Sequence, residues 1–299
     1  MKILLTGANG FLGGVVVHEL GKNHQIITLS RSVGDYKVNL DKVIPNFENS
    51  FDLVIHSAGK AHVLPKTFEE RQQFYEVNVV GTKNLLKGLE KSNLPKQFVF
   101  ISSVSVYGQD FGENINEEFS LNAKDPYGLS KIEAEVLILE WCKINNVICT
   151  ILRLPLLVGE NPPGNLGNMV KAISKGYYFN IGGGLAQKSM VLAKDVARLI
   201  PNAAPIGGVY NLTDGVNPSF YQLSLAISIH QNKKPPYNLP LFIAKLMGYF
   251  GDLLGNKMPL NSLKIKKITL GLTFDDTKAR EFLGWKPQGV LEYYEKDVI

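Results

Sequence analysis

Three groups of residues in this chain have the types and the order that a dehydrogenation needs. Gly7, Gly10 and Gly13 form a glycine-rich turn directly after the first apolar run. Ser103 ends a later apolar run, and a Y-x-x-x-K pattern, Tyr127 to Lys131, follows it. A tyrosine and a lysine at this spacing share one face of a helix. Together the groups indicate a turn that holds a dinucleotide and a Ser/Tyr/Lys set that transfers a proton while the dinucleotide transfers hydride.

Tyr127 can act as a base at neutral pH only if neighbouring groups lower the pKa of its phenol. A free phenol has a pKa near 10, about three units too high for a base at neutral pH, a gap of roughly 4 kcal/mol. We expect the Lys131 cation and an oxidised nicotinamide to close that gap, since opposite charges favour the ionised form. Ser103 would bond the substrate oxygen alongside Tyr127. The alternative, a Tyr/Lys pair on a helix surface without a role, fits the order of the three groups poorly.

The glycine-rich turn predicts how a dinucleotide would be held. Glycine allows a positive φ and lets the backbone approach a pyrophosphate, and the following helix directs its first N–H groups at the phosphates. A plain strand-to-helix turn is the alternative. The predicted cofactor contacts here are Gly7, Gly10, Phe11, Leu12 and Gly13.

The end of the second predicted strand bears on the choice between NAD and NADP. An acidic residue there would bond a free ribose hydroxyl and repel a 2′-phosphate. This chain has Ser30 followed by Arg31, whose guanidinium suits a phosphate. A solvated loop arginine is the alternative. The sequence therefore favours NADP as the cofactor, with NAD as the second possibility.

Apolar runs alternate with helical patterns through the first half of the chain. This alternation predicts βαβ units in a Rossmann-type, doubly wound parallel sheet, with ligands beyond the carboxyl ends of the strands. We expect strands at Lys2–Thr6, Gln25–Leu29, Leu53–His56, Gln97–Ser102 and Val147–Leu154, and helices near Phe11–Lys22, Phe68–Lys91 and Pro126–Asn145.

The pattern changes after Pro155, where proline and glycine become frequent and the segments less regular. We therefore predict an α/β fold of two parts. Residues 1–155 would form the dinucleotide-binding domain, with a return to it at 189–215. Residues 156–299 would form mainly a smaller C-terminal substrate-binding domain.

Composition excludes several classes of protein. The 299 residues are 45% hydrophobic, and 32 basic against 27 acidic residues give a net charge of +5. No Lys/Arg run with interleaved aromatics predicts a nucleic-acid surface. Cys142 and Cys149 provide neither a metal spacing nor a disulfide framework. Without a signal-peptide pattern we expect a cytoplasmic location. The apolar stretch 239–254 is too short for a membrane span. It is expected to be an amphipathic helix packed on the second domain, with attachment to a membrane surface as the alternative.

Sequence motifs in the same order and spacing occur in a known family. The chain resembles the extended short-chain dehydrogenase/reductase superfamily, in its nucleotide-sugar epimerase/dehydratase/reductase branch, over nearly its whole length. The motifs are T-G-A-N-G-F-L-G (6–13), D-L-V-I-H-S-A-G (52–59), V-N-V-V-G-T-K-N-L-L (77–86), F-V-F-I-S-S-V-S-V-Y-G (98–108), P-Y-G-L-S-K (126–131), L-R-L-P-L-L-V-G (152–159), K-S-M-V-L-A-K-D-V-A (188–197) and L-G-W-K-P (283–287).

The resemblance implies roles for residues that match the family's motifs. Ser103, Tyr127 and Lys131 fall on its catalytic positions. The cofactor-binding positions are Ala58 and Gly59, Asn39 and Leu40 near the adenine, and Pro155 beside the nicotinamide. The substrate-binding positions are Asn165 and Lys188 for the sugar-nucleotide diphosphate, and His62 and Ser105 for the sugar. The alternative for His62 is a loop histidine whose hydrogen bonds are satisfied locally. Asn39 replaces a common Asp, but its amide oxygen can still accept a bond from the adenine amine.

Positions where the chain departs from the family pattern reduce the number of reactions that it is expected to catalyse. Val104 and Ser105 replace the acid/base pair of the 4,6-dehydratases, so that activity is not expected. The sequence favours a 4-keto-sugar reductase acting on C4 of a nucleotide sugar, because of Ser30 and Arg31. The alternatives are an NAD-dependent 4-epimerase and, in another class, a non-catalytic dinucleotide sensor. The resemblance also suggests a homodimer through the helices 68–91 and 126–145.

Overall fold

A parallel sheet forms the centre of the molecule in the computed structural model, which describes residues 1–61, 65–254 and 261–296. Within these residues the sheet has seven strands in the order β11-β7-β5-β4-β1-β2-β3, and every neighbouring pair is parallel. The strands are β1 (Lys2–Thr6), β2 (Gln25–Ser30), β3 (Tyr36–Lys37), β4 (Leu53–His56), β5 (Gln97–Ser103), β7 (Ile148–Leu154) and β11 (Gly208–Asn211). The central strands are buried along almost their whole length, which explains their continuous apolar runs.

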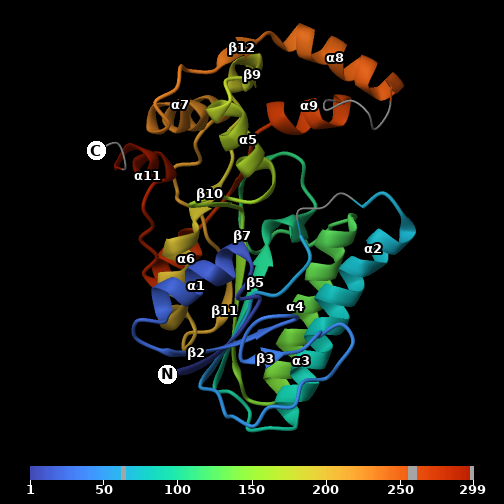
Figure 1. The fold of residues 1–299 in the computed structure, drawn as a ribbon, viewed down its shortest axis with the longest axis vertical. Coiled ribbons are helices and arrows are strands. Elements are labelled where there is room, and N and C mark those ends of the chain that lie inside the picture. Colours follow the sequence, from blue (N-terminus) through green and yellow to red (C-terminus); the bar gives the residue numbers. More distant parts are fainter. Residues whose placement is uncertain (62–64, 255–260, 297–299) are drawn as a thin grey trace.

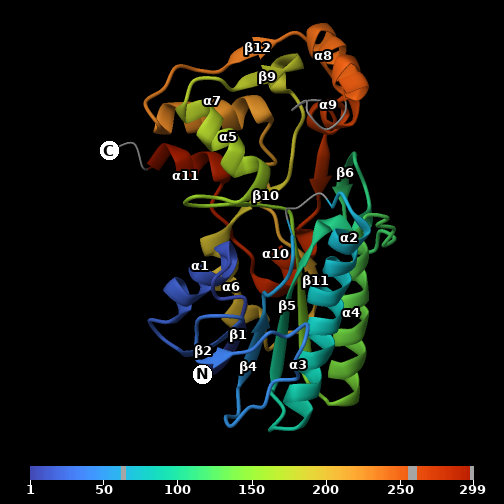
Figure 2. The same ribbon diagram turned by 45° about the vertical axis from the view of Figure 1, so that its right-hand side comes forward.

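Helices cover both faces of this sheet, as Figures 1 and 2 show. α1 (Phe11–Leu20) and α6 (Ala193–Ala203) pack on one face, while α3 (Gly81–Glu90) and α4 (Pro126–Ile144) pack on the other. α2 (Phe68–Tyr75) lies against α4 and leads into α3. The predicted α/β class and the Rossmann-type, doubly wound sheet are therefore confirmed.

A second group of elements lies beyond the carboxyl ends of the strands, at the top of Figure 1. Its main core joins α5, α7, α11, β8 and β10 around Leu166, Leu223 and Val290. The elements are β6 (Gly112–Ile115), β8 (Leu156–Val158), α5 (Gly164–Ser174), β9 (Phe179–Ile181), β10 (Met190–Leu192), α7 (Phe220–His230), β12 (Tyr237–Leu239), α8 (Leu241–Leu254), α9 (Ser262–Thr269), β13 (Leu272–Phe274) and α11 (Val290–Lys296). α10 (Thr277–Leu283) instead joins the core beneath α6.

The predicted strands and helices agree with the structure to within about two residues at their ends, with one interruption. The expected helix Phe68–Lys91 is divided by a π-helical turn at Glu76–Val80, where the hydrogen bonds lengthen to i+5. β3 and β11 were not predicted as strands. β11 places residues 208–211 at one edge of the sheet beside β7, while the division of the chain at Pro155 stays a prediction.

No helix in the described ranges is long and apolar enough to cross a bilayer. The apolar stretch 239–254 forms β12 in part and then α8, whose main contact is α9.

Candidate active site

The glycine-rich turn between β1 and α1 is closed too tightly for side chains. Gly7 has φ +76°, and a Cβ there would lie 2.6 Å from the Ala58 nitrogen. A Cβ on Gly13 would lie 2.0 Å from the Gly7 carbonyl oxygen. α1 begins after Gly10 without a side-chain cap. Its first N–H groups can therefore bond an anion, as a pyrophosphate requires.

Phe11 and Leu12 start α1 in different surroundings. Leu12 is buried in the core beneath the sheet, whereas the Phe11 ring is partly exposed and lies next to Gly159, where a Cβ would approach it to 3.1 Å. The Phe11 ring thus lies between the glycine-rich turn and the end of strand β8, which leads to the second group of elements.

The end of β2 contains a hydroxyl and a free cation instead of a carboxylate. Asn9 Nδ2 donates to Ser30 Oγ at 3.1 Å, and Ser30 Oγ donates to the Val33 carbonyl. Arg31 is exposed, and no carboxylate in the described part of the chain pairs with it. A guanidinium in this position is available to a phosphate.

Asn39 presents an unused acceptor where the sequence places the adenine. Its Oδ1 is buried and has no hydrogen-bond partner among the described residues. Leu40 is buried beside it, and its carbonyl accepts from Asn84 Nδ2 at 2.7 Å. Buried polar atoms are almost always bonded, so this orphan oxygen fits the amine of a bound adenine.

Tyr127 is positioned by the first turn of α4. The Asp125 carboxylate caps that turn by accepting from the backbone nitrogens of Tyr127 at 3.1 Å and Gly128 at 3.0 Å. A Cβ on Gly128 would lie 2.8 Å from the Ser105 carbonyl oxygen. The glycine of the Y-G-L-S-K motif therefore lets the segment after β5 approach the start of α4.

That approach brings Ser103 to Tyr127. The Ser103 hydroxyl lies close enough to the phenol to affect its pKa, and it donates to Ser105 Oγ at 3.1 Å. Burial raises the pKa of Tyr127, and Ser103 opposes the rise. The phenol is therefore held protonated, in the state of a proton donor, with a hydroxyl beside it that can bond the same substrate oxygen.

Lys131 lies beneath the phenol but is directed at the sheet. Its Nζ donates to the Ile101 carbonyl at 2.8 Å and lies 4.5 Å from the centre of the Phe100 ring. Burial lowers the pKa of Lys131 to about 8, which Glu135 partly opposes. Burial dominates the pKa of the Tyr127 phenol here, and the expectation that Lys131 and an oxidised nicotinamide together lower it stays a prediction.

The cofactor residues predicted after β4 lie close to Lys131. A Cβ on Gly59 would lie 3.5 Å from Lys131 Nζ and 3.1 Å from Asn78 Oδ1. Asn78, inside the π-helical turn, accepts from the Lys60 nitrogen at 2.6 Å and donates to Ser130 Oγ at 2.8 Å. It thereby ties the loop after β4 to α4. Apolar periodicity gives no signal for such a turn, so sequence reasoning missed it.

Glu135, one turn beyond Lys131, anchors α4 to the sheet. It pairs with Arg153 of β7 at 2.7 Å, both side chains being buried, and accepts from Ser102. Arg153 Nη1 continues to the Tyr107 hydroxyl at 3.0 Å. This network fixes α4, β5 and β7 relative to one another and so holds Ser103 against Tyr127.

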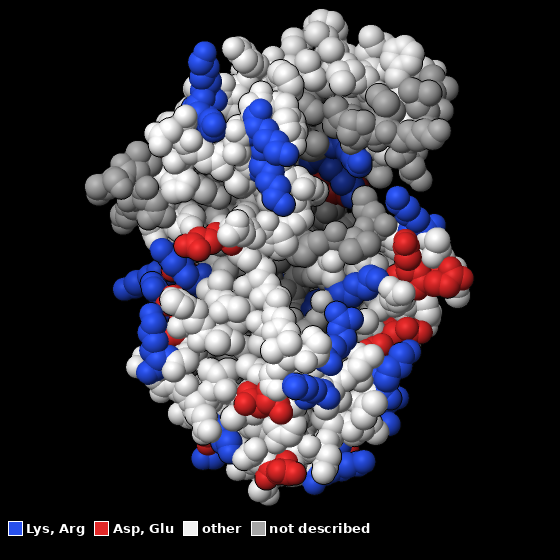
Figure 3. Space-filling view, viewed as in Figure 1, with Lys and Arg blue, Asp and Glu red and all other residues white. Residues whose placement is uncertain are grey.

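Figure 3 shows a hollow between the two groups of elements with Lys and Arg side chains at its edge, and we expect the substrate residues there. Pro155 separates β7 from β8, and Asn165 is exposed on the first turn of α5. Lys188 is half-buried; burial lowers its pKa and Asp110 opposes that. Lys267 of α9 pairs with Asp110 at 2.9 Å. Sequence reasoning missed Asp110 and Lys267, which only the tertiary fold brings near Lys188.

Two further predictions concern His62 and a metal site. His62 lies outside the described residues. No cluster of three or more His, Cys, Asp or Glu side chains in the described ranges could hold a metal ion.

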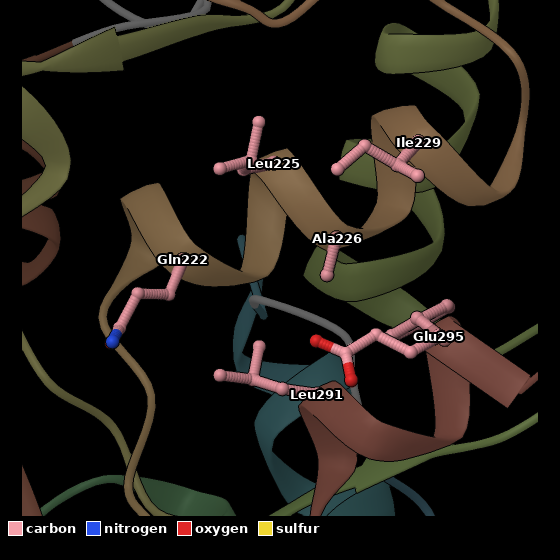
Figure 4. A pocket seen from close by; sticks show the side chains of 7 residues that line it. Gln222, Leu225, Ala226, Ile229, Leu291 and Glu295 are labelled. Atoms are coloured by element: carbon pink, nitrogen blue, oxygen red, sulfur yellow. The ribbon is translucent and has the colours of Figure 1, made fainter.

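A separate pocket of about 210 Å³ lies between α7 and α11, as Figure 4 shows. Its lining is mainly apolar and includes none of the candidate catalytic residues. The lining residues are Gln222, Leu225, Ala226, Ile229, Leu291, Tyr294 and Glu295. We therefore assign the chemistry to the Ser103–Tyr127 site and not to this pocket.

Comparison with curated proteins identifies full-length relatives. The chain is 30% identical to N-acetyl-alpha-D-glucosaminyl-diphospho-ditrans,octacis-undecaprenol 4-epimerase of Escherichia coli O157:H7, over 93% of this chain and 88% of that one. It is 31% identical to UDP-glucose 4-epimerase of Vibrio cholerae, over 97% of this chain and 92% of that one.

Solved structures share the fold at lower identity. UDP-glucuronic acid 4-epimerase from Bacillus cereus, solved with UDP-glucuronic acid and NAD, has a TM-score of 0.78 at 20% identity and covers 100% of this chain and 98% of its own. RMD from Pseudomonas aeruginosa, solved with NADPH, has a TM-score of 0.74 at 22% identity, covering 99% and 97%. A family model, the NAD dependent epimerase/dehydratase family, matches residues 3–212. The chain belongs to this family, within the extended short-chain dehydrogenases/reductases, and is an enzyme.

Proposed function

We propose that this enzyme inverts C4 of a sugar carried on a diphosphate, by oxidising that carbon and reducing it again from the other face. The observation that supports this most directly is that Ser103, at the carboxyl end of β5, lies near the Tyr127 phenol, while Lys131, one helical turn after Tyr127, lies near Gly59. The full-length relatives, both named as 4-epimerases, favour inversion over a one-way reaction.

The residues present fit a dinucleotide along the strand ends. The uncapped start of α1 would bond the pyrophosphate, Asn39 Oδ1 the adenine amine, and the backbone at Ala58 and Gly59 would lie along the middle of the cofactor. Pro155 would lie beside the nicotinamide, as the resemblance implies. When bound, the nicotinamide provides the hydride acceptor and donor at C4.

Tyr127 moves the proton at the C4 oxygen. Ser103 bonds that oxygen and orients it toward the phenol, and Tyr127 takes the hydroxyl proton during oxidation and returns it during reduction. Because burial raises the pKa of Tyr127, the protonated phenol suits the reduction step. Lys131 holds its positive charge beneath the site and favours a negative charge on the phenol during oxidation.

Lys188 and Asn165 are proposed to hold the diphosphate of the substrate. Lys188 is half-buried, and burial lowers its pKa; the negative charge of a bound diphosphate would favour its charged form. The diphosphate could bear a nucleoside, as in UDP-glucose, or a polyprenol, as in the substrate named for the Escherichia coli relative. We place the reaction in the cytoplasm, where nucleotide sugars are made available.

Reduction of a 4-keto sugar is the second candidate. Ser30 and Arg31 favour it, since a guanidinium at the end of β2 suits the 2′-phosphate of NADPH, the usual donor for a one-way reduction. The same pair is the basis for NADP as the preferred cofactor and NAD as the alternative. Val104 and Ser105 supply no acid/base pair, so elimination of water is not proposed.

Two incubations separate the two candidates. The purified enzyme is given UDP-N-acetylglucosamine, UDP-glucose or undecaprenyl-diphosphate-linked N-acetylglucosamine with catalytic NAD or NADP in D2O, and the products are analysed by NMR. An epimerase yields the C4 epimer with no solvent deuterium at C4 and no net change in cofactor. A reductase leaves these sugars unchanged but, in a second incubation with a nucleotide-linked 4-keto sugar and NADPH, oxidises one NADPH for each keto group that it reduces. If neither occurs with any diphosphate sugar, the proposed function is wrong.

A further inference from the structure

α8 presents its large apolar side chains to solvent and its small ones to the protein. Ala244 and Gly248 are buried, and a Cβ on Gly248 would lie 2.5 Å from Ile265 of α9. Phe242 is 72% exposed and Tyr249 is 63% exposed. Leu246 and Phe250 are exposed on the same side of the helix. A helix that packs on a core normally has the opposite pattern.

This apolar stripe stands apart from the rest of the molecule. In Figures 1 and 2 α8 lies at the end farthest from the sheet, supported by α9. Leu263 of α9 and Tyr237 of β12 are also exposed, at 57% and 72%. Several large apolar side chains exposed on one face of a helix mark a site of interaction with a protein or a membrane. We call the surface formed by Phe242, Leu246, Tyr249 and Phe250 the α8 face.

The charges around the α8 face decide between these partners. The segment 233–267 contains seven lysines and one aspartate, so it contributes more positive charge than the whole chain's net +5. Lys233, Lys234 and Lys245 are exposed, Lys245 within α8 itself. Aromatic and aliphatic side chains bordered by lysines are typical of helices that lie in the interface of an anionic bilayer.

We propose that the α8 face docks on an anionic lipid bilayer and makes this enzyme a peripheral membrane protein. Phe242, Leu246 and Phe250 enter the boundary between headgroups and acyl chains, and the lysines attract the anionic headgroups. α9 connects the α8 face to the candidate diphosphate site. Its Lys267 pairs with Asp110, and the negative charge of Asp110 raises the pKa of Lys188. The substrate side of the enzyme is then the side nearest the membrane.

Sedimentation with vesicles tests this directly. The full chain is mixed with vesicles of equimolar phosphatidylglycerol and phosphatidylcholine, or of phosphatidylcholine alone. Binding to the anionic vesicles is expected to be about tenfold or more tighter, and to weaken as salt screens the lysines. Phe242→Ser/Phe250→Ser and Lys245→Glu should each reduce binding by about fivefold or more. Phe282→Ser and Lys143→Glu, exposed changes elsewhere, should leave it unchanged.

The outcomes separate this inference from the proposed function. Each variant is checked for wild-type thermal unfolding and for turnover of a soluble UDP-sugar, neither of which needs the α8 face. Equal binding to both kinds of vesicle, or full binding by the Phe242/Phe250 variant, would overturn docking on an anionic bilayer. So would a concentration-dependent dimer that the same variant converts to a monomer, since the face would then bind a second copy. Failure of turnover with normal vesicle binding would count only against the proposed function.

Discussion

At the scale of single residues, the Tyr127 phenol is the group on which the proposed chemistry depends. Tyr127→Phe keeps the ring, including its edge contact with Phe74 at 6.2 Å, so folding should be unchanged within about 1.5 kcal/mol. The chemical step should slow by about 10²–10⁴-fold, the usual loss when a general acid is removed. Cofactor affinity should change far less. Single-turnover kinetics with fluorescence titration of the cofactor check both expectations, and a Phe variant with near-normal turnover would refute the mechanism.

Arg31 should distinguish the cofactors. The exposed guanidinium at the end of β2 is free to bond a 2′-phosphate, so Arg31→Ala should weaken NADPH binding by about 1–3 kcal/mol and leave NADH nearly unchanged. Calorimetric titration with each cofactor measures the difference. Arg71→Ala, another exposed arginine, is the matched control. An equal loss for NADH and NADPH would show that Arg31 does not contact the 2′-phosphate.

His56 should make the stability of the protein depend on pH. It bonds Thr6 Oγ1 at 2.7 Å and Thr82 Oγ1 at 2.8 Å, and burial lowers its pKa from 6.5 to about 3. Below pH 6.5 His56 is protonated in the unfolded chain but stays neutral in the folded protein. The free energy of unfolding therefore falls as the pH drops.

The size of that effect can be measured against a variant without the imidazole. Between pH 6.5 and about 4.5, wild type should lose roughly 2 kcal/mol more stability than His56→Gln, which bonds without titrating. Urea unfolding at several pH values gives both slopes, and the comparison cancels the carboxylates common to both proteins. Parallel slopes would mean that His56 titrates normally in the folded protein.

At the scale of elements, the turn between β1 and α1 has a matched pair of glycines. A Cβ on Gly13 would lie 2.0 Å from the Gly7 carbonyl oxygen, whereas one on Gly14 would be 3.8 Å from the Ala8 oxygen. Gly13→Ala should therefore shift the turn, lower the melting temperature and abolish tight cofactor binding. Gly14→Ala should be neutral or stabilise α1 by up to about 1 kcal/mol. Similar behaviour of the two variants would mean that the turn relaxes without cost.

The same elements show what sequence could predict and what it could not. Strands β1, β4, β5 and β7 were predictable because buried parallel strands leave continuous apolar runs. The two-residue β3 leaves no such pattern. The direction of the Lys131 ammonium depends on the Ile101 carbonyl and the Phe100 ring. Contacts of that kind, like the pairing of Asp110 with Lys267, follow from the packing of distant segments and have no local sequence signal.

At the scale of the whole molecule, a second apolar surface supports the predicted homodimer. On α4, Leu129, Val136 and Leu139 are exposed, and on the neighbouring α2 so are Phe68 and Tyr75. α2 and α4 lie side by side in Figures 1 and 2, on the face of the sheet opposite α1. Pairing of this surface with its copy would bury the apolar groups about a two-fold axis.

A single charge at the centre of that surface tests the homodimer. Val136 is 47% exposed, so Val136→Glu costs little in the monomer but buries an unpaired carboxylate in the dimer. We expect wild type to elute as a dimer and Val136→Glu as a monomer in size-exclusion chromatography with light scattering. Phe282→Glu, at an exposed position of α10, should remain dimeric. A monomeric wild type at high micromolar concentration would reject the homodimer, and a dimer that persists in Val136→Glu would place its interface away from α2 and α4.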